Sequence, residues 1–81
     1  MAIELTNNYM KLNLLALVGD KALLARLNDN SFVVANGLEI REDFSCTWAF
    51  AYGYFTSYDK AYACFYNKVL KDFTEYVEEL V

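Results

Sequence analysis

The chain has 81 residues, of which 57% are hydrophobic and 17% aromatic, and its formal net charge is −4. A single domain covering residues 1–81 is expected, and a chain this short buries only about 60% of the surface that its unfolded state exposes. Its seven Lys and Arg residues are scattered without a basic stripe, which disfavours direct binding of nucleic acid. A basic protein surface is the partner that an acidic, aromatic-rich protein suits better.

The sequence contains two cysteines and no histidine. Cys46 and Cys64 form no C-x-x-C pair, so we expect no zinc site, and one disulfide is allowed but not required. The first residues lack the basic segment of a secretion signal, and the apolar run from Leu14 to Val18 is too short to span a bilayer. We therefore expect a cytoplasmic protein with reduced thiols, no metal or cofactor, and no membrane attachment.

The first predicted element is a helix from about Asn7 to Val18, which Thr6 can cap. Apolar residues follow the helical period in this region: Leu5, Tyr9, Leu12 and Ala16. Gly19 suits the position just after a helix end, where a left-handed residue is needed.

A second, shorter helix is predicted from Lys21 to about Asn28, with Asp20 as its cap. A strand from Ala22 to Leu27 is the weaker interpretation, since Ala and Leu favour helix. The polar cluster from Asn28 to Ser31 then predicts a turn.

Strands are predicted from Phe32 onward, and two arrangements compete. Asn36 and Gly37 could form a two-residue turn between short strands. Alternatively, Gly37 is a bulge in one longer strand, and the turn runs from Arg41 to Ser45. We prefer the second arrangement, because it gives two arms of matching length at about 31–40 and 46–55.

This register predicts a hairpin with two different faces. Large side chains would share one face: Phe32, Val34, Leu38, Ile40, Trp48, Phe50, Tyr52 and Tyr54. Small side chains and one acid would share the other: Val33, Ala35, Gly37, Glu39, Thr47, Ala49, Ala51 and Gly53. The bulky face would form the core or, in part, a binding patch, and the small face would lie under the N-terminal helices or act as a flat docking site.

The last predicted element is a helix from about Tyr58 to Glu79, capped by Ser57. Apolar residues follow it at heptad spacing: Tyr62, Tyr66, Val69, Phe73, Tyr76 and Leu80. The expected fold class is therefore α+β, with N-terminal helices, an antiparallel hairpin of two or three strands, and a long C-terminal helix packed on the sheet.

Acidic residues gather in two places. They are Glu39, Glu42 and Asp43 at the hairpin tip, and Asp72, Glu75 and Glu79 on one face of the last helix. The plain interpretation is a solvated surface, because Lys68 and Lys71 lie four residues before two of the helix acids. The functional interpretation is that these acids imitate part of a phosphate row, with exposed aromatic residues as anchors: Trp48, Tyr52 and Tyr54.

No set of residues indicates catalysis. There is no histidine base, and Cys46 and Cys64 lack a partner that would activate them. The adjacent carboxylates Glu42 and Asp43 lack an environment that would make one an acid and the other a base. Three scattered glycines form no phosphate-binding loop. We do not expect an enzyme.

A block within residues 32–61 resembles a pattern found in small bacterial phage and mobile-element proteins, in which a hairpin leads into a helix. It comprises Phe32-Val33-Val34-Ala35-Asn36-Gly37-Leu38, Trp48, Tyr52-Gly53-Tyr54-Phe55-Thr56-Ser57 and Ala61. In size, acidity, aromatic content and lack of catalytic residues, the chain is also similar to anti-CRISPR proteins. That resemblance implies stoichiometric inhibition of a Cas effector, by occupying a basic nucleic-acid channel or by locking a domain.

The leading hypothesis is thus a non-enzymatic protein-binding module that inhibits a nucleic-acid-binding effector. The alternative is a structural or regulatory homodimer, joined through a hairpin edge or through the last helix at Phe73 and Tyr76.

Overall fold

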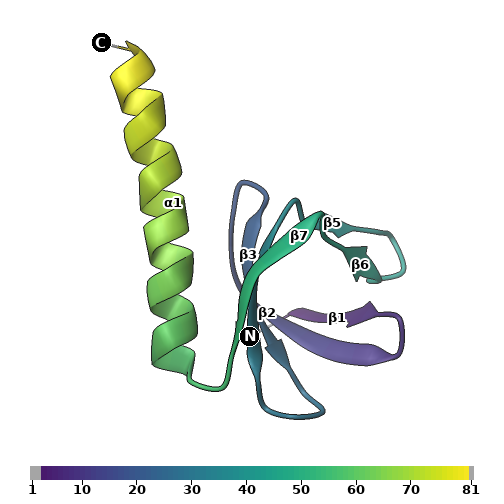
Figure 1. Ribbon diagram of the computed structural model, residues 1–81. Helices are drawn as coiled ribbons and strands as arrows, with labels where there is room; N and C mark the ends of the chain where they lie inside the picture. Colours follow the sequence, from purple (N-terminus) through teal and green to yellow (C-terminus); the bar gives the residue numbers. More distant parts are fainter. Residues whose placement is uncertain (1–2, 81) are drawn as a thin grey trace.

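The computed structural model describes residues 3–80, with side chains described from 3 to 70. Five strands form an antiparallel sheet in the order β1-β2-β3-β4-β7: β1 (Ile3–Asn7), β2 (Met10–Val18), β3 (Lys21–Arg26), β4 (Phe32–Asn36) and β7 (Phe50–Phe55). A smaller sheet pairs β5 (Glu39–Ile40) with β6 (Cys46–Thr47), and α1 (Tyr58–Leu80) follows β7. The helix lies on one side of the larger sheet, and the small sheet lies on the other (Figure 1).

The predicted N-terminal helices are wrong, because residues 3–26 contain three consecutive antiparallel strands. Asn8 (φ 57°) and Gly19 (φ 62°) lie in the two-residue turns that join them. A left-handed residue can end a helix or close a hairpin, so Gly19 is compatible with both structures. The bulge between Leu14 and Ala16 places these two residues on opposite sides of the sheet, which hides the period-two pattern of a strand.

The two predicted hairpin arms do pair with each other, but they lie in two sheets. β4 pairs with β7 and β5 pairs with β6, and the turn between β5 and β6 covers residues 41–45. Gly37 (φ 77°) lies between β4 and β5, where the chain leaves the larger sheet. The predicted strand through Gly37 is therefore interrupted rather than continuous.

The prediction that the large side chains of the hairpin share one face is wrong. A register shift at Val34 and Ala35 leaves Tyr52 as an extra residue in β7. Beyond that bulge, the side chains of β7 alternate in the opposite sense. The aromatic residues predicted on one face therefore lie on different sides of the sheet. Trp48 packs on the side of the larger sheet that faces the small sheet, whereas Tyr52 packs on the side that α1 covers.

The core has two parts, one on each side of the larger sheet. The inner cluster lies between the two sheets and contains Leu5, Leu12, Ala22, Leu24, Val33, Ala35 and Cys46. The second cluster lies under α1 and contains Leu23, Val34, Ala61 and Phe65. Burying a Leu or Val side chain completely stabilises the fold by about 1.5–3 kcal/mol, so the inner cluster makes the larger contribution.

The C-terminal helix contacts the sheet through Ala61, Phe65 and Val69. The residues of the predicted heptad seam do not all contact the sheet, because Tyr62 and Tyr66 are exposed whereas Val69 packs against it. The helix predicted from about Tyr58 to Glu79 is present as α1, and its described contacts with the sheet come from residues 61–69. Phe73, Tyr76 and Leu80 lie outside the residues whose side chains are described. In the described part of the chain, no helix has the length and apolar content needed to cross a membrane.

The hairpin tip formed by residues 41–45 folds back onto the first strand. The amide of Thr6 donates to the carbonyl of Phe44 over 3.0 Å, and Asn7 Nδ2 donates to the carbonyl of Cys46 over 2.8 Å. A single parallel bridge also joins Thr6 and Ser45. These contacts close the inner cluster and bring the tip beside the β1–β2 turn, as Figure 1 shows.

Two glycine substitutions test how the chain leaves the larger sheet at Gly37. A Cβ at Gly37 would lie 2.9 Å from the Cβ of Ala49, whereas a Cβ at Gly19 meets nothing within 4 Å. Both positions have positive φ, so Gly19→Ala measures the backbone cost alone, about 1–2 kcal/mol. We expect Gly37→Ala to lower the free energy of unfolding by a further ~1–3 kcal/mol, measured by urea denaturation. Equal losses in the two variants would contradict the close packing at Gly37.

Candidate functional site

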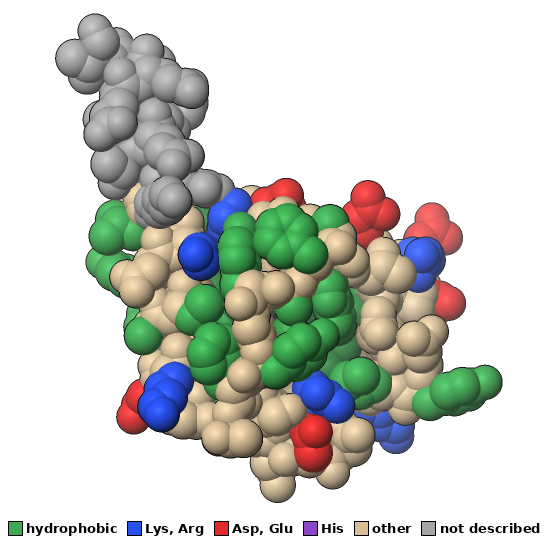
Figure 2. Space-filling view, viewed as in Figure 1, with side chains coloured by type: hydrophobic (Ala, Val, Ile, Leu, Met, Phe, Trp, Pro, Cys, Tyr) green, Lys and Arg blue, Asp and Glu red, His purple; other side chains and the backbone are tan. Residues whose placement is uncertain are grey.

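Three of the predicted site residues lie together at the hairpin tip. Glu39, Glu42 and Asp43 are all exposed, and Arg41 is the one cation within residues 39–45. Three carboxylates against one guanidinium leave this segment with a net charge of −2. Acidic side chains are also visible on the side of the molecule away from the helix (Figure 2). The tip therefore presents negative charge as predicted, on a short and exposed turn.

Hydrogen bonds fix the conformation of this turn. Asp43 Oδ1 accepts from the amide of Ser45 over 3.0 Å and from its hydroxyl over 2.6 Å. The amide of Arg41 donates to the carbonyl of Ser45, and the amide of Phe44 donates to the carbonyl of Arg41. The Ser45 hydroxyl bond, together with the amide bond, holds the pKa of Asp43 below its ordinary value. Asp43 is thus ionised at neutral pH.

Phe44 has an unusual backbone conformation at the centre of the tip. Its φ is 64°, and its side chain is 58% exposed. The left-handed region costs a residue with a Cβ about 1–2 kcal/mol, and bulky residues are rare there. Because the ring is largely in water, burial does not offset that cost. Strained residues are found preferentially at functional sites, which makes Phe44 the centre of the candidate site.

The β1–β2 turn adds a second exposed ring next to the tip. Tyr9 is completely exposed at the end of this turn, and Ile40 in β5 is 41% exposed. The bond from Asn7 to the carbonyl of Cys46 holds the two segments together. We call the resulting patch the tip surface; it comprises Tyr9, Glu39, Ile40, Glu42, Asp43 and Phe44.

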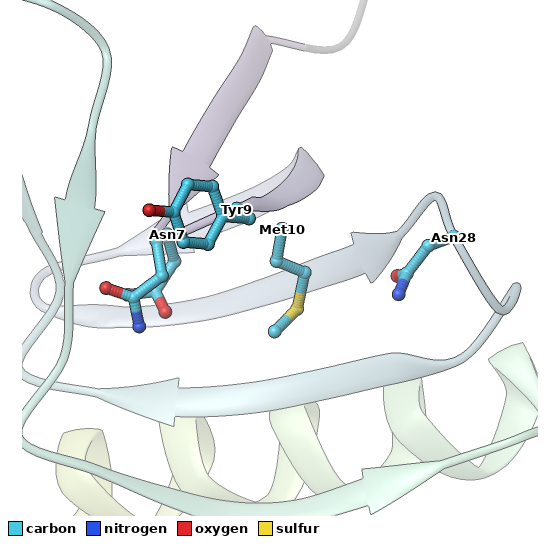
Figure 3. Close-up of a pocket in the computed structure, with 5 residues that line it drawn as sticks. Asn7, Tyr9, Met10 and Asn28 are labelled. Atoms are coloured by element: carbon cyan, nitrogen blue, oxygen red, sulfur yellow. The ribbon is translucent and has the colours of Figure 1, made fainter.

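A pocket of about 270 Å³ lies beside the β1–β2 turn (Figure 3). Its lining comprises Asn7, Asn8, Tyr9, Met10 and Asn28. Sequence reasoning missed this site, because it placed residues 7–18 in a helix. The signal that could have revealed it is the pair Asn7-Asn8 between two apolar segments, which is typical of a turn.

The three aromatic residues predicted as anchors do not join the tip surface. Trp48 packs against the inner cluster, and the hydroxyl of Tyr52 donates to Asn36 Oδ1 over 3.1 Å. Tyr54 is 59% exposed, and the Arg26 guanidinium carbon lies 5.8 Å from the centre of its ring. The three rings therefore do not form one binding patch with the tip surface.

The acids predicted on the last helix fall outside the residues whose side chains the structure describes. They are Asp72, Glu75 and Glu79, which belong to α1. The helix and the tip lie on opposite sides of the larger sheet (Figure 1).

An exposed row of tyrosines follows one side of α1. Tyr58, Tyr62 and Tyr66 are each about half exposed, and neighbouring rings stack with centroids 6.0 and 6.3 Å apart. Phe32 meets the first of them edge-on at 5.7 Å. Their spacing of four residues places them on one helix face, which meets the sheet at Tyr58 through Phe32 and is exposed at Tyr62 and Tyr66.

The cysteines offer little reactivity. Both are free thiols; Cys46 is buried, and this burial raises the pKa of its thiol. A raised pKa disfavours the thiolate, which is the nucleophilic form. Among the described residues, no three Cys, Asp or Glu side chains come together in a way that could hold a metal ion.

Comparisons with protein-family models, with curated proteins and with solved structures give no match for this chain. Assignment of a function therefore depends on the geometry of the tip surface and its surroundings.

Replacing Phe44 by Gly tests the strain at the tip. Gly adopts positive φ without a steric cost, so we expect Phe44→Gly to raise the free energy of unfolding by about 1 kcal/mol. The matched control is Asn30→Gly at φ 57°, where the gain should be smaller because Asn tolerates this region. Urea denaturation measures both. A loss of stability in Phe44→Gly would show that the ring supports the fold.

The Asp43 carboxylate gives a pH-dependent test of the same turn. Because its pKa is lowered in the folded state, its contribution to stability is present above the ordinary Asp pKa. That contribution is lost as the pH falls through the lowered value. An NMR titration of the Asp43 carboxyl should show the lowered pKa, and Ser45→Ala should return it toward the ordinary value. An unchanged titration in Ser45→Ala would exclude the Ser45 hydroxyl as the cause.

Proposed function

We propose that this protein is a non-enzymatic protein-binding module that inhibits a nucleic-acid-binding effector by covering a basic surface on it. The tip surface makes the contact. The observation that carries this proposal is Phe44, an exposed ring held in a strained conformation among three carboxylates. Strained residues cluster at binding and catalytic sites, which supports a binding role for Phe44.

The two kinds of residue in the tip surface have different roles in binding. Glu39, Glu42 and Asp43 attract a basic partner and orient its approach, which raises the association rate and the specificity. Phe44 and Tyr9 provide the buried contacts, since aromatic anchors at the centre of an interface contribute ~2 kcal/mol or more each. They take the anchor role that the sequence predicted for Trp48, Tyr52 and Tyr54. The hydrogen-bonded turn lowers the cost of ordering on binding.

Cas effectors are the first partners to test. The resemblance to anti-CRISPR proteins supports this choice, as does the net charge of −4. A guide-loaded effector has a positively charged channel for nucleic acid, to which an acidic tip is complementary. Such an inhibitor acts in the bacterial cytoplasm and binds no nucleic acid itself.

Binding to a panel of guide-loaded Cas effectors tests the proposal. We expect a one-to-one complex with at least one of them, weakened by raised salt because exposed charges are screened. Phe44→Ala should weaken the complex about tenfold or more, and charge reversal at Glu39, Glu42 and Asp43 should slow association. Isothermal titration calorimetry and stopped-flow measurements provide these values.

Tyr66→Ala is the matched control, because it removes an exposed aromatic side chain on the opposite side of the sheet. Equal affinity for wild type, Phe44→Ala and the charge-reversed variant would contradict the tip surface as the contact.

A homodimer is the second candidate function, and the exposed row of Tyr58, Tyr62 and Tyr66 favours it. Aromatic residues on an open helix face can pack against a second copy. Light scattering at low and high salt separates the candidates. A dimer that persists in high salt and dissociates in Tyr62→Ala would favour the homodimer, whereas a monomer supports inhibition through the tip.

A further inference from the structure

We propose that the pocket beside Tyr9 binds an arginine side chain of the protein partner. This inference rests on the proposed function and names the group that the tip surface recognises. It follows from the one polar group that is fixed in the pocket, from the exposed ring at its rim, and from the charges around it.

The fixed polar group is the side-chain oxygen of Asn7. A backbone carbonyl can only accept hydrogen bonds, so the group of Asn7 that faces the Cys46 carbonyl over 2.8 Å is its NH₂. This bond orients the amide of Asn7, one of the residues that line the pocket, and leaves its Oδ1 as the atom that can accept a hydrogen bond from a ligand. A ligand that fits this group must bring a donor, and a guanidinium brings five.

The ring of Tyr9 forms the rim of the pocket and favours a cation. Figure 3 shows the ring next to Asn7, with the Met10 side chain between them and Asn28. The face of a tyrosine ring attracts a cation, and guanidinium groups use this contact more often than ammonium groups. Elsewhere in this chain, Arg26 and Lys68 already lie over the rings of Tyr54 and Tyr52. Tyr9 is completely exposed and available to a cation from outside.

The charges near the pocket permit a cationic ligand. None of the lining residues is charged. Lys11 pairs with Thr6, so it points to the opposite face of β2 from Met10, which pairs with Asn7. Arg26 is bound to Asp29, with its Nη2 3.3 Å from Oδ2. The tip beside the pocket has a net charge of −2 and attracts a basic side chain to this side of the molecule.

The size of the pocket suits a single side chain. Small-molecule sites usually measure about 300–1,000 Å³, and this one is below that range at about 270 Å³. Arginine is favoured over lysine, because a planar guanidinium can stack on Tyr9 while it donates to Asn7.

Two peptides of equal charge test the inference. They are acetylated pentapeptides with one central arginine or one central lysine, titrated into the full chain and followed by NMR. We expect the arginine peptide to shift the amide signals of Tyr9, Met10 and Asn28, and to bind about tenfold more tightly than the lysine peptide. Tyr9→Leu and Asn28→Ala should remove that preference. Tyr66→Ala and Asn67→Ala, which change the same residue types on α1, should retain it.

The outcomes separate this inference from the proposed function. Equal weak binding of both peptides, or shifts confined to the tip acids, would overturn the arginine site and leave effector binding through Phe44 unaffected. Arginine-selective shifts at the pocket, lost in Tyr9→Leu, would support the site even where no tested effector binds. An effector complex that forms equally well with Tyr9→Leu would also overturn the arginine site, because the pocket would then have no role in it.

Discussion

The closure of the hairpin tip onto β1 is the constraint on which the rest of the structure depends. Two hydrogen bonds make it: the Thr6 amide to the Phe44 carbonyl, and the Asn7 amide group to the Cys46 carbonyl. Without them, the inner cluster around Leu5 and Cys46 would be open to water on one side. The closure therefore links the hydrophobic core to the position of the tip.

The same closure explains how an unfavourable conformation persists. Phe44 lies between Thr6, which binds its carbonyl, and Arg41, which accepts from its amide. Strained residues are retained where the surrounding structure determines their conformation more strongly than their own preference does. The Phe44 ring is thereby held outward beside the acidic residues of the turn, and the Asn7 amide is held against the Cys46 carbonyl. One set of bonds thus fixes the exposed ring, the acidic turn and the neighbouring β1–β2 turn relative to one another.

The sequence predicted local features that depend on neighbouring residues and missed those that depend on distant ones. The acidic turn at 41–45, the pairing of its two arms and the helix start at Tyr58 follow from local signals. The strands at 3–26 were predicted as helices, with a strand at Ala22–Leu27 only as the weaker interpretation, because the bulge between Leu14 and Ala16 and the left-handed turn residue Gly19 make their pattern resemble helices. Within the candidate site, Glu39, Glu42 and Asp43 were predicted. Tyr9 and the pocket were missed, since only the long-range bond from Asn7 to Cys46 brings that turn to the tip.

A double-mutant cycle tests most directly whether the closure of the hairpin tip onto β1 imposes the strain on Phe44. The free energy of unfolding is determined for wild type, Phe44→Gly, Asn7→Ala and the double variant. Asn7→Ala removes one of the two closing bonds and loosens the tip, so the stabilisation by Phe44→Gly should shrink, with a coupling energy of about 1 kcal/mol. Additive effects of the two substitutions would contradict the account, because the conformation of Phe44 would then be independent of the closure.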